Sequence, residues 1–221
     1  KYKNKYQSKR CFIIGNGPSL KETNLNLLKN EYTFGTNRIY ILFDKLGFST
    51  TFFVVIDTQI IRQYSDDINS IKANKFIMWK NRHDVRFDSK TIFFEQDLDI
   101  SFKSDIKKRL YTSGSVTFIA IQLAYYMGFD PVILVGVDHS YKTVRKSKDD
   151  VKLFAYDNKS QFSLDSYKKG DVWVPPDPQK QELGYRMARF AYESTGREIL
   201  DATIEGKLKI FPKVNYNSLF S

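Results

Sequence analysis

Several short polar clusters in this sequence contain residue types that bind charged or polar ligands. In "GNGPS", two glycines let a phosphate or sugar approach the backbone, Asn16 offers an amide, and Ser19 can cap the turn that follows. The other clusters are Asn37, Asp57, Thr112-Ser113-Gly114 and Asp138-His139-Ser140-Tyr141. Each cluster alone is also compatible with an ordinary turn, so its interpretation depends on the elements that position it.

Those elements form an α/β pattern. Apolar runs at 10–15, 32–37, 50–57, 75–80, 91–96, 131–138 and 197–203 predict strands. Helical spacing at 58–73, 112–128 and 177–196 predicts helices between them. This alternation predicts an open, doubly wound, mostly parallel α/β sheet, in which ligands bind at the carboxyl ends of the strands. The polar clusters follow strands or open helices, so we expect them to meet at one edge.

Two of the predicted helices begin next to candidate site residues. The segment 112–128 is apolar nearly all round, so we expect a buried helix capped by Thr112 or Ser113 and ended by Gly128, with an anion site at its N-terminus. Asp177 and Pro178 predict the start of a second long helix. The polar stretch 142–175 between these regions predicts a lid or binding loop.

Composition limits the class of protein. The 221 residues suit a single domain spanning 1–221, and the first residue is Lys1 rather than Met, so we expect a fragment of a longer chain. One cysteine, Cys11, excludes a disulfide framework and fits a cytoplasmic protein. The net charge of +10 suits an anionic substrate or the anionic inner membrane, at which we expect peripheral contact. We find no nucleic-acid-binding motif and expect no such partner, whereas assembly into a homo-oligomer stays open.

Familiar catalytic motifs are missing from the sequence. It has no HExxH, no pair of CxxC motifs, no GxSxG and no phosphate-binding loop ending in Gly-Lys-Ser/Thr. We therefore expect no metal site and no cofactor. Of the two histidines, His83 lies in a predicted loop, while His139 follows a predicted strand beside an acid and is the better candidate for chemistry.

Two segments carry a resemblance to a known group. "IIGNGPSLKE" and "RLYTSGSVTFIAIQLAYYMGFDPVILVGVDHSY" resemble the bacterial sialyltransferases of glycosyltransferase family 42 and the wider DUF115 group, which is 6-hydroxymethylpterin diphosphokinase MptE-like. The resemblance spans about residues 10–141 and continues weakly in the tail. It implies a Rossmann-like domain, a GT-A-like sialyltransferase variant with a lid insertion. It also implies a metal-independent transferase that uses a CMP-sugar donor.

The resemblance implies roles for particular residues. The positions that match nucleotide and sugar contacts of the sialyltransferases are Gly15, Asn16, Gly17, Ser19, Asn37, Thr112, Ser113 and Gly114, with Arg109 matching at a one-residue offset. Tyr141, with Tyr156 second, matches tyrosines that contact the phosphate and assist departure of CMP. We add Asp57 and Asp138 to the predicted substrate-binding residues.

The sequence also departs from the sialyltransferase pattern. Asp57 stands where that family has an asparagine, and "GDVWVPPDPQKQ" lacks the histidine that acts as its catalytic base. Asp177, Asp171 and His139 are the available substitutes, of which we take His139 and Asp177, with Tyr141, as the predicted catalytic residues.

The leading hypothesis is a glycosyltransferase that moves a sialic-acid-like nonulosonate from CMP onto a bacterial surface glycan or glycolipid. A second hypothesis is a pterin diphosphokinase-like enzyme that uses ATP and Mg²⁺, with Asp57 and Asp138 as metal ligands. A third is a catalytically inactive module that binds a nucleotide sugar.

Overall fold

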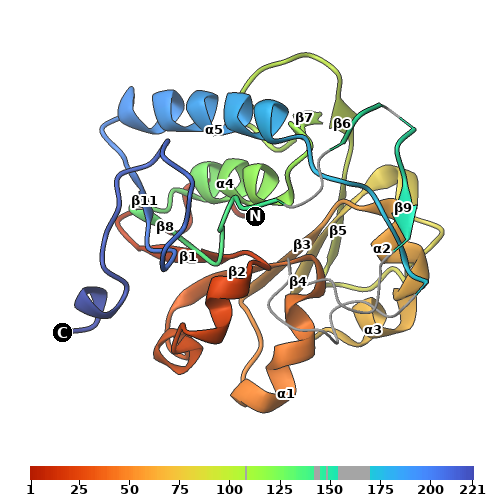
Figure 1. The fold of residues 1–221 in the computed structure, drawn as a ribbon, viewed down its shortest axis with the longest axis horizontal. Coiled ribbons are helices and arrows are strands. Elements are labelled where there is room, and N and C mark those ends of the chain that lie inside the picture. Colours follow the sequence, from red (N-terminus) through yellow and green to blue (C-terminus); the bar gives the residue numbers. More distant parts are fainter. Residues whose placement is uncertain (108, 142–144, 148, 154–169) are drawn as a thin grey trace.

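A computed structural model describes residues 1–107, 109–141, 145–147, 149–153 and 170–221. Its centre is a seven-stranded sheet in the order β11-β8-β1-β2-β3-β4-β5, with every neighbouring pair parallel (Figure 1). The strands are β1 (Cys11–Ile14), β2 (Tyr32–Thr36), β3 (Phe52–Val55), β4 (Asn74–Met78), β5 (Thr91–Phe94), β8 (Val132–Val135) and β11 (Ile199–Asp201). The predicted doubly wound α/β sheet is confirmed.

The central strands are short and apolar because both faces of the sheet are covered. All four residues of β1, β3 and β8 are buried. Alternate residues of β1 point to opposite faces, so that Cys11 and Ile13 join one core cluster while Phe12 and Ile14 join the other. This explains why these strands read as continuous apolar runs rather than alternating ones.

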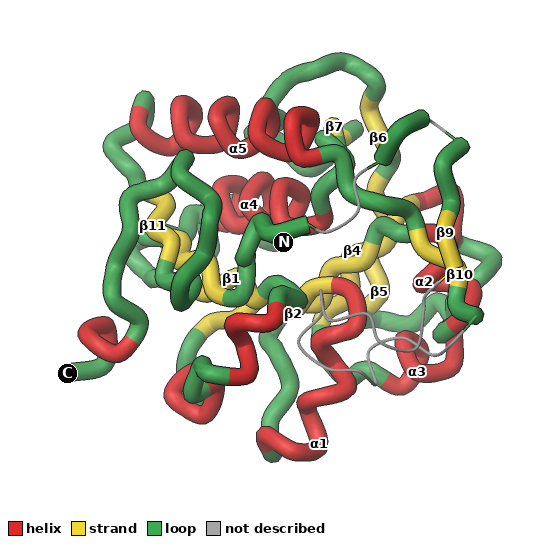
Figure 2. The backbone as a smooth tube through the Cα atoms, viewed as in Figure 1, coloured by secondary structure: helices red, strands yellow, loops and turns green. Residues whose placement is uncertain are grey.

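Different kinds of segment cover the two faces. On one face α4 (Val116–Met127) lies on the sheet and α5 (Pro178–Glu193) packs on α4 (Figure 1). The other face is covered by short helical turns joined by loops (Figure 2). These are η1 (Pro18–Lys21), η2 (Leu25–Leu28), η3 (Asn37–Leu42), α1 (Phe43–Leu46), α2 (Thr58–Gln63), α3 (Ser65–Ser70), η4 (Trp79–Asn81) and η6 (Asn217–Leu219). Within the described part of the chain, none of the helices has the length and apolar character that a membrane span requires.

The helix predicted over 58–73 is divided in two at Tyr64. Its backbone (φ −132°, ψ 34°) leaves the helical region between α2 and α3. Two tertiary contacts hold its side chain: the Arg38 guanidinium lies 3.3 Å from the ring centroid, and the hydroxyl donates to the Asp171 carboxylate. The apolar spacing continues through the break, which is why the sequence predicts one helix.

Two small strand pairs lie outside the main sheet. They are β6 (Gln96–Asp97) with β7 (Leu110–Tyr111), which is parallel, and β9 (Lys152–Leu153) with β10 (Val172–Trp173), which is antiparallel. The backbone of Val172 exchanges two hydrogen bonds with the Gln63 amide of α2. β9 and β10 belong to the predicted lid at 142–175; most of that stretch lies outside the described residues, and its closure stays a prediction.

Candidate functional site

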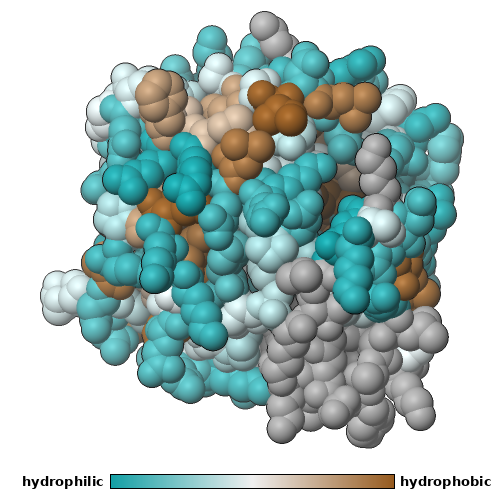
Figure 3. All heavy atoms as spheres, turned by 45° about the horizontal axis from the view of Figure 1, so that its top comes forward, coloured by the Kyte–Doolittle hydropathy of each residue, from teal (hydrophilic) through white to brown (hydrophobic). Residues whose placement is uncertain are grey.

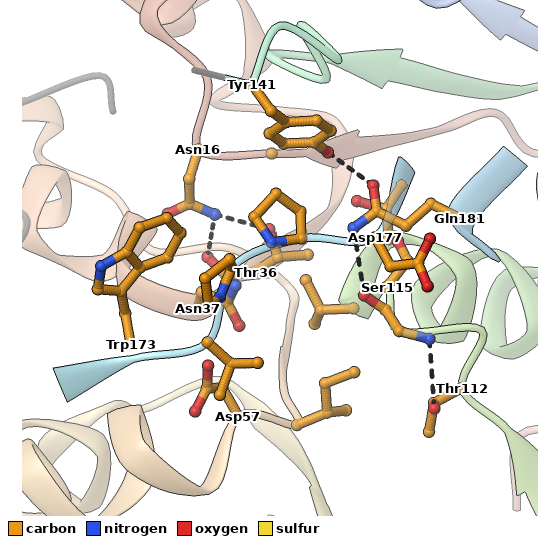
Figure 4. A pocket seen from close by; sticks show the side chains of 18 of the residues that line it. Asn16, Thr36, Asn37, Asp57, Thr112, Ser115, Tyr141, Trp173, Asp177 and Gln181 are labelled. Carbon is orange, nitrogen blue, oxygen red and sulfur yellow. Dashed lines mark hydrogen bonds between the residues drawn. The ribbon is translucent and has the colours of Figure 1, made fainter. Parts of the chain in front are cut away.

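A cavity of about 840 Å³ opens at the carboxyl edge of the sheet, lined by the loops after β1, β2, β3 and β8 and by the starts of α4 and α5 (Figure 4). The chain passes from β1 outward to β5 and then returns to β8 on the other side of β1. This reversal is the switch point of the sheet, where open α/β folds bind ligands. The volume is in the range of small-molecule sites.

The glycines after β1 serve packing between the loops that follow β1 and β8. A Cβ atom at Gly15 would lie 2.3 Å from the Gly136 carbonyl oxygen, and one at Gly17 would lie 1.7 Å from Oδ2 of Asp138. Neither Gly15 nor Gly17 has a positive φ, so close packing rather than an unusual backbone conformation requires glycine at both positions. Both still line the cavity, because the close packing brings the two loops to its wall.

Asp138 holds these two loops together. Its carboxylate accepts hydrogen bonds from the Ser19 backbone N–H at 2.9 Å and from the Ser19 hydroxyl at 2.7 Å. Burial raises the pKa of Asp138, against the effect of these hydrogen bonds. Ser19 itself does not line the cavity, so its predicted contact with a ligand is replaced by a supporting role.

Asn16 and Asn37 bring unpaired amide oxygens to the cavity (Figure 4). The Asn16 amide nitrogen donates to the Thr36 carbonyl at 2.8 Å and to its hydroxyl at 3.0 Å. The Oδ1 atoms of Asn16 and Asn37 are buried without a hydrogen-bond partner among the described residues. Since buried polar atoms are nearly always paired, these oxygens indicate a ligand with N–H or O–H donors.

Three of the six described residues other than glycine that have a positive φ line the cavity or lie next to it. Asn37, Ser113 and His139 have φ values of 49°, 49° and 52°, a left-handed conformation that residues other than glycine rarely adopt. Such strain persists only where the surrounding structure enforces it, and it collects at functional sites.

The start of α4 contributes a different cap from the one predicted. Ser115, not Thr112 or Ser113, is the N-cap: its Oγ accepts from the Phe118 N–H at 3.3 Å and lies 2.8 Å from the Tyr185 hydroxyl. Thr112 and Gly114 line the cavity together with Ser115. Ser113 does not, because its left-handed backbone directs its hydroxyl to the Lys180 carbonyl of α5.

Asp177 is the N-cap of α5, as the sequence predicts: its Oδ1 accepts a hydrogen bond from the Lys180 N–H at 3.0 Å. Gln181, one turn later, was missed by the sequence analysis. Its amide donates to the Gly114 carbonyl at 3.2 Å, and its Oε1 accepts from the Tyr141 hydroxyl at 2.7 Å (Figure 4). Gln181 follows Asp177 by four residues, so both lie on the same side of the helix. This spacing is the feature of the sequence from which Gln181 could have been predicted.

Tyr141 and His139 form a ring pair at the cavity wall. Their ring centroids are 5.3 Å apart at an interplanar angle of 76°. Burial raises the pKa of the Tyr141 phenol, so this residue stays protonated and acts as a hydrogen-bond donor. His139 Nε2 lies 3.1 Å from Oε1 of Glu182, while Nδ1 is buried without a partner among the described residues.

Charged side chains of both signs line the cavity. The cations are Lys80, Arg145, Lys152 and Lys180, and the acids are Asp57, Asp138 and Asp177. Asp57 caps α2 by accepting from the N–H groups of Gln59 and Ile60, and burial raises its pKa. The three carboxylates thus accept hydrogen bonds from backbone N–H groups, and Asp138 also accepts one from the Ser19 hydroxyl. Lys80, in contrast, makes no hydrogen bond to a described residue.

Two predicted site residues fall elsewhere or cannot be placed. Arg109 lies on the surface, where it pairs with Glu95 at 2.8 Å, and it does not line the cavity. β7 begins one residue later, and the arginine side chain is 67% exposed beside Glu95, so its contact with a ligand stays a prediction. Tyr156 lies outside the described residues.

The second hypothesis places Mg²⁺ on two carboxylates, and Mg²⁺ usually takes only one or two carboxylates from a protein, with phosphates and waters as its other ligands. No group of three or more histidine, cysteine, aspartate or glutamate side chains among the described residues could hold a metal ion. The carboxylates that the second hypothesis assigns to Mg²⁺, Asp57 and Asp138, are already held by hydrogen bonds from the protein.

The fold and the position of the cavity define a Rossmann-like ligand-binding domain of the doubly wound class. The sequence profile of the family described as MptE-like, 6-hydroxymethylpterin diphosphokinase MptE-like, matches residues 1–144. This is well over half of the chain, so the chain belongs to the MptE-like family. A search of curated proteins found no match.

Solved structures with a similar fold include two glycosyltransferases. The MAf glycosyltransferase from Magnetospirillum magneticum AMB-1 has a TM-score of 0.60 at 13% identity over 98% of this chain, which spans only 37% of that protein's length. The sialyltransferase CstII from Campylobacter jejuni, in complex with the substrate analogue cytidine-5'-monophosphate, has a TM-score of 0.54 at 15% identity, covering 96% of this chain and 86% of that one. At these identities the likeness establishes the fold.

Proposed function

We propose that this protein is a glycosyltransferase that transfers a sugar from a nucleotide-activated donor, in particular a sialic-acid-like nonulosonate from CMP, without a metal ion. The observation that carries the proposal is the cavity at the switch point, in which two unpaired asparagine oxygens lie beside the N-termini of two long helices. The fold shared with glycosyltransferases, one of them bound to cytidine-5'-monophosphate, supports it.

The nucleotide would occupy the part of the cavity next to β1 and β2. The oxygens of Asn16 and Asn37 can each accept one hydrogen bond, and a cytidine offers an exocyclic amino group and ribose hydroxyls as donors. The amide nitrogen of Asn16 is already committed to Thr36, so this side chain presents its oxygen in a fixed orientation.

The phosphate and the sugar carboxylate would lie near the N-terminus of α4. α4 has 12 residues and the neutral Ser115 as its N-cap, so its N-terminus is a positive dipole end. α5 has 16 residues, but Pro178 lacks an N–H group and the Asp177 carboxylate already caps the helix. Lys80 and Lys180 add positive charge to the same cavity. Together these groups favour a ligand that carries both a phosphate and a carboxylate.

In the proposed reaction the acceptor hydroxyl oxygen forms a bond to the anomeric carbon, while the bond from that carbon to the phosphate oxygen breaks and its electron pair leaves with CMP. Tyr141, neutral because burial raises its pKa, would exchange its hydrogen bond to Gln181 for one that it donates to the leaving phosphate. His139 would take the proton from the acceptor hydroxyl. Asp177 is the weaker candidate for this role, because its carboxylate caps α5.

The acceptor would be a surface glycan or glycolipid, reached from the cytoplasmic side of the inner membrane. The net charge of +10 supports peripheral docking at an anionic bilayer. The second candidate function, an ATP-dependent diphosphokinase-like transfer, is favoured by the family to which the chain belongs. In that reaction Asp57 and Asp138 would hold Mg²⁺, although both carboxylates already accept hydrogen bonds from the protein.

Thermal unfolding with CMP, CDP or ATP, each with EDTA or with Mg²⁺, tests the proposal. We expect cytidine nucleotides to raise Tm in EDTA, by about 2.7 kcal/mol of added stability at a ligand concentration 100 times Kd. A shift only with ATP and Mg²⁺ would replace the proposal with the diphosphokinase. A cytidine shift without release of CMP from any CMP-nonulosonate would reduce the protein to a binding module.

A further inference from the structure

His139 is held rigidly at the wall of the cavity. Its side chain is only 9% exposed, and its ring packs edge-on against Tyr141 and, at 6.5 Å between centroids, against Tyr185. The backbone of this residue is in the left-handed region, with φ 52°. Packing on two sides and a constrained backbone leave the imidazole one orientation, so its two nitrogens have fixed and different surroundings.

The two nitrogens differ in their partners. Nε2 lies 3.1 Å from Oε1 of Glu182, and Nδ1 has no partner among the described residues. An ionised carboxylate only accepts hydrogen bonds, so the single proton of a neutral imidazole belongs on Nε2. Nδ1 then keeps its lone pair, and the hydrogen bond made by one nitrogen decides the state of the other.

We propose that Glu182 is a positioning residue: it fixes the tautomer of His139, a residue that lines the cavity, with the proton on Nε2 and so leaves Nδ1 as the nitrogen that can accept a proton. This inference rests on the proposed function, in which the proton that Nδ1 receives is the one lost by the acceptor hydroxyl. The imidazole then carries two protons and a positive charge, which the Glu182 carboxylate stabilises through Nε2.

Other charged and titratable groups surround this pair. Arg186 lies 3.3 Å from the second oxygen of Glu182 and keeps that carboxylate oriented along α5. The neighbouring Asp138 is held by hydrogen bonds from the β1 loop. The hydroxyls of Tyr141 and Tyr185 pair with side chains of α5 and α4. Among the described residues, none of these groups makes a hydrogen bond to the imidazole. Glu182 is therefore the one described partner that distinguishes its two nitrogens.

Nuclear magnetic resonance of ¹⁵N-labelled histidine tests this directly, since the chain has only two histidines. In the neutral form we expect the His139 proton on Nε2. The exposed His83 serves as an internal reference for an unconstrained tautomer mixture. Glu182→Ala should move His139 toward that mixture, and Glu182→Gln should restore the Nε2 tautomer because its amide oxygen still accepts. Glu193→Ala is the matched control, because Glu193 makes the same i,i+4 arginine pair on α5.

A proton on Nδ1 in the wild-type protein, or a tautomer that Glu182→Ala leaves unchanged, would overturn the inference. This measurement needs no donor, so it separates the two proposals. If the tautomer depends on Glu182 but no cytidine nucleotide binds, the proposed function fails and the positioning role stands. Once a donor is identified, Glu182→Ala should lower kcat about 10–100-fold with little change in the donor KM, and Glu182→Gln should recover part of it.

Discussion

The two cavity asparagines differ in how far each can be replaced without disturbing the protein. Asn16 holds the β2 end through two hydrogen bonds to Thr36, so its loss would disturb the loops as well as the site. Asn37 makes no hydrogen bond through its Oδ1, but its φ of 49° is strained for most residues. Glycine accepts that φ without cost, which makes Asn37 the residue that can be removed cleanly.

We predict that Asn37→Gly weakens CMP binding about fivefold, because one hydrogen bond contributes about 1 kcal/mol. The backbone conformation should persist, so the unfolding free energy should change much less than for a substitution by alanine. Isothermal titration calorimetry measures the first quantity and urea unfolding the second.

The control for this change is Asn4→Gly. Asn4 is exposed, has a φ of 52° and lies outside the cavity, so it undergoes the same substitution in the same backbone region. Equal effects of both variants on CMP binding would contradict a direct contact at Asn37.

Much of the site could be predicted at the residue scale because parallel strands end at one edge. Asn16, Asn37, Asp57 and Asp138 follow strands, and all four line the cavity. The directions of loop side chains could not be predicted. Ser113 turns to α5 because its backbone is left-handed, a conformation that the letters "TSG" do not reveal.

At the scale of elements, the starts of the helices combine structural and chemical roles. Asp177→Ala should lower the unfolding free energy by about 1 kcal/mol, because the α5 N-cap is lost. Asp177→Asn keeps a capping oxygen and should leave both stability and turnover nearly unchanged if His139 is the base. Urea unfolding and CMP release measure the two.

Two results for the Asp177 variants would contradict these expectations. Full stability with no CMP release in Asp177→Asn would assign the base to Asp177 and remove His139 from that role. Unchanged stability in Asp177→Ala would contradict the capping role itself.

The pairing of β4 with β5 depends on a buried ammonium. Lys75 is 2% exposed at its side chain and lies 2.8 Å from the Asp88 carboxylate, which precedes β5. The hydrogen bond from Lys75 lowers the pKa of Asp88 to about 2. A lowered carboxyl pKa adds stability above the ordinary value near 4, and that stability is lost as the pH falls toward 2.

We therefore predict that the unfolding free energy falls between pH 5 and pH 2, with about 1 kcal/mol of the loss due to Asp88 because the carboxylate is partly exposed. Asp88→Asn should remove this part of the pH dependence. Urea unfolding across that range measures it, and Glu193→Gln is the control, since both side chains of the Arg189–Glu193 pair are exposed. An equal effect at Glu193 would contradict the role of the buried Lys75.

Helices and strands could be predicted where the spacing of apolar residues agrees with the packing of the fold. They could be predicted less well where tertiary contacts override that spacing. The apolar spacing from Ile60 to Ile71 predicts one helix, yet contacts of Tyr64 with Arg38 and Asp171 divide it. Those partners lie far away in the sequence, so local spacing carries no information about them.

At the scale of the whole molecule, exposed aromatic rings lie at the β5 edge of the sheet among basic residues. Phe87 is 74% exposed and stacks at 6.1 Å on Phe93, whose ring also meets Trp79. Arg82 covers one face of the Trp79 ring at 4.8 Å. Aromatic rings with nearby cations are typical of surfaces that contact a bilayer interface.

If the protein docks at an anionic membrane, we predict that Phe87→Ser weakens its binding to phosphatidylglycerol vesicles in a sedimentation assay, and that added salt weakens it further. The matched control is Phe190→Ser. Phe190 is 75% exposed on α5. Figure 3 brings the top of Figure 1, where α5 lies, toward the viewer, and hydrophobic side chains gather there among hydrophilic ones. Equal losses for both variants, or equal binding to neutral phosphatidylcholine vesicles, would contradict docking through the β5 edge.

The pairing of β1 with both β2 and β8 also affects how the chain is made. Cys11 pairs with Tyr32 on one side and with Val132 on the other, so the second neighbour of β1 is synthesised 121 residues after it. At ribosomal speeds of about 5–20 residues per second, β1 waits roughly 6–24 s with one open edge of four apolar residues. The cavity wall between the two strands does not exist during that time. A ligand therefore cannot protect the nascent chain, and a ribosome that stalls before residue 132 leaves an edge open to aggregation.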